Sequence, residues 1–288
     1  MSTRSSAITT SFLEWKTWPL FTDSQSKQVS TSMVTERILR RGRSMEFTEV
    51  KGLDIYDALY ESFHRQLNEK FPVKLLGSGT ICKLPIKLEI DSHAFDKDIG
   101  ALTFLSKARF TKLVNQYVDR ELYKGFVESC KLRNNKMSSF TFKQPKYDFE
   151  LSKHTQGGCL IGIFFSHLQN NLIVISRTTY IGYMAFVDGV LIHKIAEDMN
   201  TNPSISWIIF EQQLSYQKSI PFCISQGYFK KKMKPENKTK YNIELRYHKV
   251  MTRDNLKFGP LKRLKKNLVR IEDGDALHSW YPKDVSIL

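Results

Sequence analysis

Residues 159–178 read Cys159-Leu-Ile-Gly-Ile-Phe-Phe-Ser-His-Leu-Gln-Asn-Asn-Leu-Ile-Val-Ile-Ser-Arg-Thr178, and they follow the glycine pair Gly157-Gly158. The apolar runs Leu160–His167 and Leu172–Arg177 are separated by a short polar segment, Gln169-Asn170-Asn171. Two apolar runs joined by a polar turn are typical of a β-hairpin with buried strands. We therefore expect a β-hairpin here.

The residues after this hairpin predict a helix and then a further strand. Apolar residues recur at helical spacing from about Gly182 or Tyr183 to Met199, and Ser206–Leu214 is an apolar run of strand length. The apolar helical positions are Met184, Val187, Leu191, Ile195 and Ala196. These elements predict an α/β (α+β) fold, in which covering helices pack on a mixed, mostly antiparallel sheet.

Upstream of the hairpin, two segments have the spacing of amphipathic helices. Asp54–Phe71 is expected to be a helix capped by Asp54, and Lys107–Ser129 is expected to be a second helix. Between them, Leu75–Glu89 contains a glycine turn followed by alternating apolar residues, which predicts a strand.

The charge is distributed unevenly along the 288 residues. The formal net charge is +15, and the stretch from Lys230 to Arg270 has 15 Lys and Arg against three acidic residues. We divide the chain into a flexible Ser/Thr/Arg-rich extension (1–45), a folded domain (46–229) and a basic C-terminal segment (230–288). Such a segment attracts nucleic acid through counterion release, although a solvated basic face has the same composition.

The four cysteines are expected to be free thiols. Cys82, Cys130, Cys159 and Cys223 include no C-x-x-C pair and no recognisable histidine spacing, so no metal site is expected. No secretory signal with a hydrophobic core is recognisable, which favours a cytoplasmic protein (in the host cytoplasm if it is viral). The apolar runs fall well short of the roughly 20 residues that span a membrane, so we expect a soluble protein without a membrane partner.

The order of residues from Cys159 to Tyr216 resembles the core of thymidylate synthases. In that family a catalytic Cys opens a strand, and the following hairpin leads to the pattern R-S-x-D-x-x-x-G-x-P-F-N. Here the pair Arg177-Thr178 stands for R-S, and Asp188 lies eleven residues after Arg177, where the family has its Asn. The stretch Ser206-Trp207-Ile-Ile-Phe-Glu-Gln-Gln213-Leu is similar to the family's later strand, V-W-T-G-G-D-x-H-x-Y. The resemblance covers residues 159–216 and identifies the domain at 46–229 as thymidylate-synthase-like and catalytic.

The resemblance also implies a site, a cofactor and an assembly. The implied roles are nucleophile for Cys159, phosphate binding for Arg177 and Thr178, pyrimidine binding for Asp188, and sugar binding for Gln213 and Tyr216. The implied substrate is a pyrimidine deoxynucleoside monophosphate. The implied one-carbon donor is 5,10-methylenetetrahydrofolate, and the implied assembly is a homodimer. We assign no residue to the general base or to the cofactor site.

These residue types suit the alkylation of a pyrimidine at carbon 5. A thiolate that adds to carbon 6 makes carbon 5 nucleophilic, and a nearby cation such as Arg177 is expected to lower the thiol pKa. A guanidinium binds a phosphate dianion through two parallel hydrogen bonds, and the Thr178 hydroxyl adds another.

Asp188 favours cytosine over uracil as the base. A carboxylate accepts a hydrogen bond from the cytosine amino group and, when protonated, donates one to the ring nitrogen. Within this superfamily, Asp at this place resembles the bacteriophage deoxycytidylate hydroxymethylases. We therefore expect hydroxymethylation of dCMP, with dUMP as substrate and methylation as close alternatives.

Each of these residues also has a structural interpretation. Cys159 could be a small core residue, Arg177 a surface charge and Asp188 a solvent-facing or capping group, while Trp207 is expected in the core. The family's Asp is replaced by Tyr180, and this departure leaves an inactive or repurposed member open. The alternative function is a non-catalytic nucleic-acid-binding or viral assembly protein, which the basic segment motivates.

Overall fold

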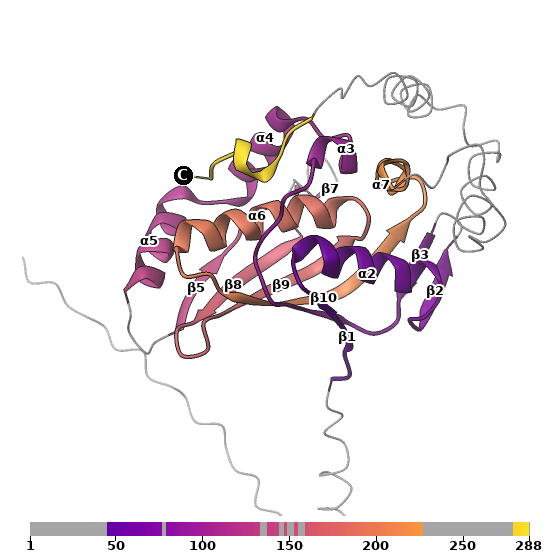
Figure 1. Cartoon of the computed structure of the whole chain (residues 1–288), viewed down its shortest axis with the longest axis horizontal. Coiled ribbons are helices and arrows are strands. Elements are labelled where there is room, and N and C mark those ends of the chain that lie inside the picture. The colour runs from indigo at the N-terminus through magenta and orange to yellow at the C-terminus, as the bar shows by residue number, and fades with distance from the viewer. Residues whose placement is uncertain are drawn as a thin grey trace, which may run out of the picture. The chain divides into compact units, whose positions relative to one another are not determined.

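The computed structural model describes residues 45–76, 79–132, 137–143, 147–148, 153–154, 159–226 and 279–287 (Figure 1). By its internal contacts the chain divides into two units, Met1–Met45 and Glu46–Leu288. All helices and strands given below belong to the second unit. The extension before Met45 and the basic stretch 230–270 lie outside the described residues.

The predicted hairpin, helix and strand are confirmed, and they follow one another without interruption. Strand β8 (Leu160–Ser166) pairs antiparallel with β9 (Asn171–Tyr180), and the turn contains Asn170 at a φ of 46°, a left-handed conformation that Asn tolerates. Helix α6 (Met184–Met199) then connects β9 to β10 (Ser204–Ser215), which runs parallel to β9. This β9–α6–β10 unit forms the middle of the sheet.

The main sheet is mixed and mostly antiparallel, as predicted. Its order is β1-β4-β10-β9-β8-β5, and β3 also pairs with β10 and carries β2 at its edge. The pairs β1–β4 and β9–β10 are parallel, and the remaining pairs are antiparallel. The further strands are β1 (Thr48–Gly52), β2 (Val73–Leu76), β3 (Gly79–Cys82), β4 (Ile86–Ile90) and β5 (Met137–Thr141), with a separate pair formed by β6 (Tyr147–Asp148) and β7 (Lys153–His154).

Helices gather on one side of this sheet (Figure 1). The helix predicted over Asp54–Phe71 is confirmed as α2 (Ile55–Leu67), which ends earlier than expected. Asp54 caps it as predicted, since its carboxylate accepts a hydrogen bond from the Asp57 amide at 2.7 Å. Helix α6 is buried around most of its circumference, since the sheet lies beneath it and other helices contact it. The other helical elements are α3 (Ile99–Thr103), α4 (Lys107–Tyr117), α5 (Arg120–Lys131), α7 (Ile220–Ser225) and the short η2 (Pro282–Asp284). No helix among the described residues has the length and apolar character needed to cross a membrane.

The structure corrects one sequence prediction about these segments and confirms the main part of another. The single helix expected over Lys107–Ser129 is two helices, because Val118 is extended and the Asp119 side chain caps α5 by accepting a hydrogen bond from the Leu122 amide. The strand expected after the glycine turn within Leu75–Glu89 is present as β4, in which the alternating residues Ile86, Leu88 and Ile90 are buried. A bend before Pro85 separates it from β3, which the prediction did not distinguish.

Two buried polar contacts fix the helices and strands around the middle of the sheet. The side-chain amide of Gln212 in β10 donates to the side-chain oxygen of Gln66 in α2 at 2.8 Å. The Gln66 amide in turn donates to the Gln212 backbone carbonyl at 3.4 Å and to the Thr80 hydroxyl of β3 at 3.0 Å. The indole of Trp207 is fully buried and donates to the Ser176 hydroxyl at 2.7 Å, so Trp207 is a core residue, as predicted.

The last described residues pack within the same unit, although the charge pattern groups them with the basic segment. The Trp280 indole donates to the Leu105 carbonyl at 2.6 Å, and its backbone amide donates to the Asp98 carboxylate at 3.2 Å. Residues 279–287 therefore lie against α3 and the start of α4.

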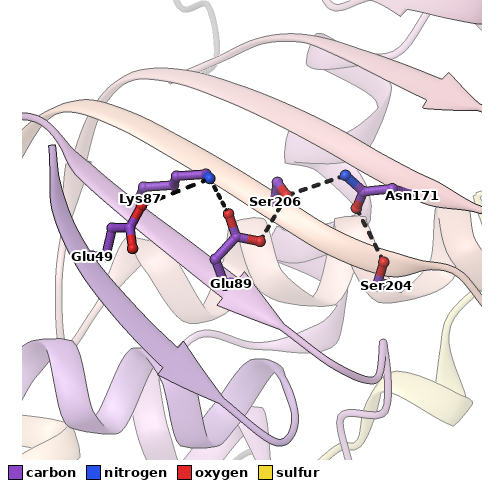
Figure 2. Close-up of polar contacts among 6 residues, drawn as sticks. All are labelled: Glu49, Lys87, Glu89, Asn171, Ser204 and Ser206. Atoms are coloured by element: carbon purple, nitrogen blue, oxygen red, sulfur yellow. Dashed lines mark hydrogen bonds and ion pairs between the residues drawn. The ribbon is translucent and has the colours of Figure 1, made fainter. Parts of the chain in front are cut away.

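The face of the sheet opposite the helices has a polar margin and an apolar centre. Figure 2 shows the margin, a chain of hydrogen bonds and ion pairs across four strands. It contains Glu49, Lys87, Glu89, Ser206, Asn171 and Ser204. Beside it, the apolar residues Phe164, Ile173, Ile175 and Ile208 lie at adjacent positions of β8, β9 and β10. Each of these four is only partly buried.

Candidate functional site

The start of β8 and the ends of β9 and β10 lie side by side at one end of the sheet. Cys159 directly precedes β8 there. Because β8 runs antiparallel to β9, the start of β8 lies beside the later part of β9, and the Arg177 amide donates to the Cys159 carbonyl at 2.8 Å. Strand β10 is parallel to β9 and ends at the same edge, where Thr178 lies opposite Glu211 and Tyr180 opposite Gln213. In open α/β sheets, ligands bind outside the carboxyl ends of such parallel strands.

The alternation of buried side chains shifts at this level of the sheet. In β9 every second side chain from Leu172 to Ser176 is buried, but the next buried side chain is Thr179, three residues on. In β10 the alternation shifts in the same way between Ile209 and Gln212. The register of β8 against β9 also shifts, between Leu160 and Gly162. An extra residue in a strand redirects its side chains, and the shift therefore changes which β9 and β10 residues are buried at these strand ends.

Cys159 is the only partly exposed cysteine, since Cys82, Cys130 and Cys223 are buried. The pKa of the Cys159 thiol is raised to about 11, first by burial and then by the Asp188 carboxylate, while the charges of Arg177 and Lys218 oppose this rise. Arg177 thus acts in the predicted direction, but its effect is outweighed. The thiol is protonated at neutral pH because burial, which the sequence pattern does not measure, outweighs the effect of the cation.

Asp188 lies on α6 with only 2% of its surface exposed. Burial raises its pKa to about 7, partly offset by the Thr179 hydroxyl, which donates to a carboxylate oxygen at 3.4 Å. In the part of the chain that the structure describes, no cation forms an ion pair with this carboxylate. A buried acid without a cation is costly, and such groups are concentrated at functional sites.

Two further side chains act on this pair, and the sequence did not indicate either. Tyr117, at the end of α4, is buried, and its pKa is raised to about 12 by burial and then by Asp188 and Cys159. Lys218 lies in the turn after β10, and its charge acts on the Cys159 thiol. Both residues come from segments distant from the hairpin, so only the tertiary fold brings them to the site.

The remaining predicted site residues lie on the neighbouring strands. Thr178 is partly buried in β9, and Gln213 of β10 donates a hydrogen bond from its amide to Glu211. Tyr216 directly follows β10 and is 8% exposed. The charges of Arg177 and Asp188 thus act on Cys159, and Thr178, Gln213 and Tyr216 lie along the same strand ends.

In the glycine turn that leads into β3, the two described residues, Gly79 and Thr80, have structural roles. Gly79 lies so close to β10 that a Cβ atom there would approach the Leu214 carbonyl oxygen to 1.8 Å. Thr80 is buried and accepts a hydrogen bond from Gln66.

Within the described ranges, no group of three or more His, Cys, Asp and Glu side chains is placed to bind a metal ion. No family model matches the chain, and no curated protein matches its sequence significantly. The class that the structure defines is a mixed α+β domain with helices on one face of an open, mostly antiparallel sheet.

Proposed function

We propose that this protein binds a pyrimidine deoxynucleoside monophosphate and transfers a one-carbon unit to carbon 5 of the base, with Cys159 as the nucleophile. The preferred reaction is hydroxymethylation of dCMP, and dUMP is the alternative substrate. The observation that carries the proposal is a buried carboxyl group, Asp188, that has no cation partner among the described residues and acts on the Cys159 thiol.

The pKa of Asp188 supports cytosine recognition. With a pKa of about 7, Asp188 is present in both its neutral and its ionised form near physiological pH. The neutral form donates to N3 of cytosine while its carbonyl oxygen accepts from the exocyclic amino group. Uracil presents a donor at N3 instead, and a neutral carboxyl group complements it less well.

Base binding and thiol ionisation are coupled in this arrangement. The Asp188 carboxylate raises the pKa of Cys159, so protonation of Asp188 removes a charge that opposes the thiolate. A cytosine ring whose N3 accepts a hydrogen bond from the carboxyl O–H group stabilises neutral Asp188. Binding of the base should therefore lower the pKa of the Cys159 thiol. Linkage requires the reverse effect as well, so the thiolate favours neutral Asp188 and strengthens cytosine binding.

The reaction itself follows from the electron movements in the ring. The Cys159 sulfur forms a bond to carbon 6, and the electron pair of the 5,6 double bond moves to carbon 5, which forms the new carbon–carbon bond. Loss of the carbon 5 proton and cleavage of the sulfur–carbon 6 bond then restore the ring. When bound, 5,10-methylenetetrahydrofolate would supply the transferred carbon and leave as tetrahydrofolate once its carbon–nitrogen bonds are broken, and water would supply the hydroxyl group with loss of a proton. We assign no described residue to the folate.

The open face of the sheet supports a homodimer. Phe164, Ile173, Ile175 and Ile208 form an apolar centre with a charged margin, and such a patch on an otherwise polar surface is typical of a protein interface. Two copies related by a twofold axis would place the same patch against itself, which is the commonest form of homodimer.

Release of tritium from carbon 5 tests the proposed chemistry. We expect the protein to release tritium to water from 5-tritiated dCMP, and more slowly from dUMP, in the presence of methylenetetrahydrofolate. Cys159→Ser should abolish release, whereas Cys130→Ser, which changes a buried cysteine, should retain it. Absence of release from both nucleotides would overturn the catalytic function.

A further inference from the structure

We propose that Lys218, seated on the ring of Tyr180, is the second cation of an anion-binding subsite beside Cys159 and binds the substrate phosphate together with Arg177. This inference rests on the proposed function, which it extends by one binding residue and one supporting ring. Neither residue corresponds to a ligand in the pattern that the sequence resembles, since Tyr180 replaces an Asp and Lys218 lies beyond the matched stretch.

The position of Lys218 is set by contacts with two strands. The turn after β10 is closed by the Ser219 amide, which donates to the Ser215 carbonyl at 3.0 Å, and the Lys218 amide donates to the Ser215 hydroxyl at 3.4 Å. This turn brings the Lys218 ammonium to 3.6 Å from the centre of the Tyr180 ring. Tyr180 is the last residue of β9, three residues after Arg177, so the contact holds the ammonium at the strand end that carries the guanidinium.

Both cations are available for an anion. Arg177 and Lys218 are exposed, and within the described residues neither side chain is in an ion pair. Lys218 lies over Tyr180, which is in the same strand as Arg177, and both charges lower the pKa of the Cys159 thiol. Two unneutralised cations at one strand end complement a phosphate dianion, with the guanidinium as a planar fork and the ammonium as a point charge.

The aromatic platform explains how a flexible lysine becomes a defined ligand. A cation–π contact is worth roughly 0.5–1 kcal/mol at an exposed site, which is enough to favour one side-chain position but leaves the three N–H donors free. The ring therefore restricts the ammonium without neutralising its charge.

Ligand protection of Cys159 against iodoacetamide tests the inference. The apparent Kd is taken from the ligand concentration that halves the alkylation rate, so differences in the absolute rate between variants cancel. The probes are dCMP, deoxycytidine and inorganic phosphate. The variants are Lys218→Met, Lys218→Arg, Tyr180→Leu and the control Lys107→Met, which removes an exposed lysine from α4.

We expect Lys218→Met to weaken protection by dCMP and by phosphate about tenfold or more, the usual effect of losing a charge-assisted hydrogen bond. Protection by deoxycytidine should stay unchanged, Lys218→Arg should retain most of the affinity, and Tyr180→Leu should give an intermediate loss. Lys107→Met should behave like the wild type.

The outcomes separate this inference from the proposed function. If Lys218→Met binds dCMP as tightly as the wild type, the subsite assignment is wrong while the nucleotide site stands. If phosphate protects in a Lys218-dependent manner but dCMP protects no better than phosphate, the subsite stands and the nucleotide function is wrong. If neither dCMP nor phosphate protects the wild-type protein, both are overturned.

Discussion

At the scale of single residues, the site depends on a negative charge placed beside a thiol. The Asp188 carboxylate lies in a buried environment, where the interaction between charges is stronger than in water, and it raises the pKa of Cys159. Arg177 and Lys218 oppose this effect but do not overcome burial. The thiol is therefore protonated and weakly nucleophilic at neutral pH, mainly because it is buried, and protonation of Asp188 would remove the second cause of its raised pKa.

Replacing Asp188 by Asn should make Cys159 easier to ionise. The substitution removes the carboxylate that raises the thiol pKa, so the pH profile for alkylation by iodoacetamide should move to lower pH. The rate at pH 8 should rise about tenfold for each unit by which the pKa falls. Glu197→Gln, which removes an acid from the same helix, is the control and should leave the profile unchanged; an unchanged profile for Asp188→Asn would show that the two groups do not interact.

The same carboxyl group should make stability depend on pH. Burial raises the pKa of Asp188 from its ordinary 3.8 to about 7, so the folded state holds this proton more tightly than the unfolded state does. Stability is therefore lost as the pH rises from about 4 to 7, and a difference of this size corresponds to about 4 kcal/mol. Urea denaturation should show Asp188→Asn gaining stability over the wild type at pH 8 but hardly at pH 4; equal differences at both pH values would contradict this.

Sequence reasoning found the part of the site that lies within one continuous unit. Cys159, Arg177 and Asp188 occur within a hairpin and the helix after it, where spacing along the chain fixes the spatial relation. Tyr117 and Lys218 join the site from other elements, and no spacing rule connects them to the hairpin. The raised pKa of Cys159 could not be predicted from the sequence pattern either, because burial depends on how α6 covers the strands.

At the scale of elements, hydrophobic periodicity identified the central unit well and the segment after Lys107 poorly. The β8–β9 hairpin and α6 have strong apolar patterns bounded by Gly and Asn residues, and their limits were predicted to within a few residues. The pattern over Lys107–Ser129 continues through Val118 and Asp119, but the Asp119 side chain competes for the backbone and starts a new helix. A local capping interaction therefore overrides a continuous apolar face.

The cap gives a prediction about α5. Asp119→Ala removes the acceptor for the Leu122 amide and should reduce the free energy of unfolding by about 1 kcal/mol, measured by urea denaturation. Asp119→Asn keeps a capping oxygen and should cost much less. An alanine variant as stable as the wild type would mean that packing alone separates α4 from α5.

At the scale of the whole unit, the two faces of the sheet differ in what covers them. The described helices cover one face, while the other presents partly buried isoleucines beside the polar chain of Figure 2. Antiparallel sheets commonly leave one face polar and exposed to water, whereas apolar patches mark interaction sites, and the apolar centre of this face therefore supports the proposed dimer.

Ile175→Lys should therefore separate the proposed dimer. Light scattering after size-exclusion chromatography should give the mass of two chains for the wild type and of one chain for the variant, because burying an unpaired ammonium at the centre of the interface is costly. Leu122→Lys, an exposed position on α5, should remain dimeric. A wild-type protein that is monomeric at high concentration would contradict the assembly.

The most direct test of the central claim is to trap the covalent bond between Cys159 and the base. A 5-fluoro analogue of dCMP, incubated with methylenetetrahydrofolate, has no proton to lose from carbon 5, so the adduct should accumulate. Mass spectrometry should then find the nucleotide attached to the peptide that contains Cys159, and Asp188→Asn should shift the preference towards the 5-fluoro analogue of dUMP. An unmodified Cys159 with both analogues, or an adduct on another cysteine alone, would contradict the account.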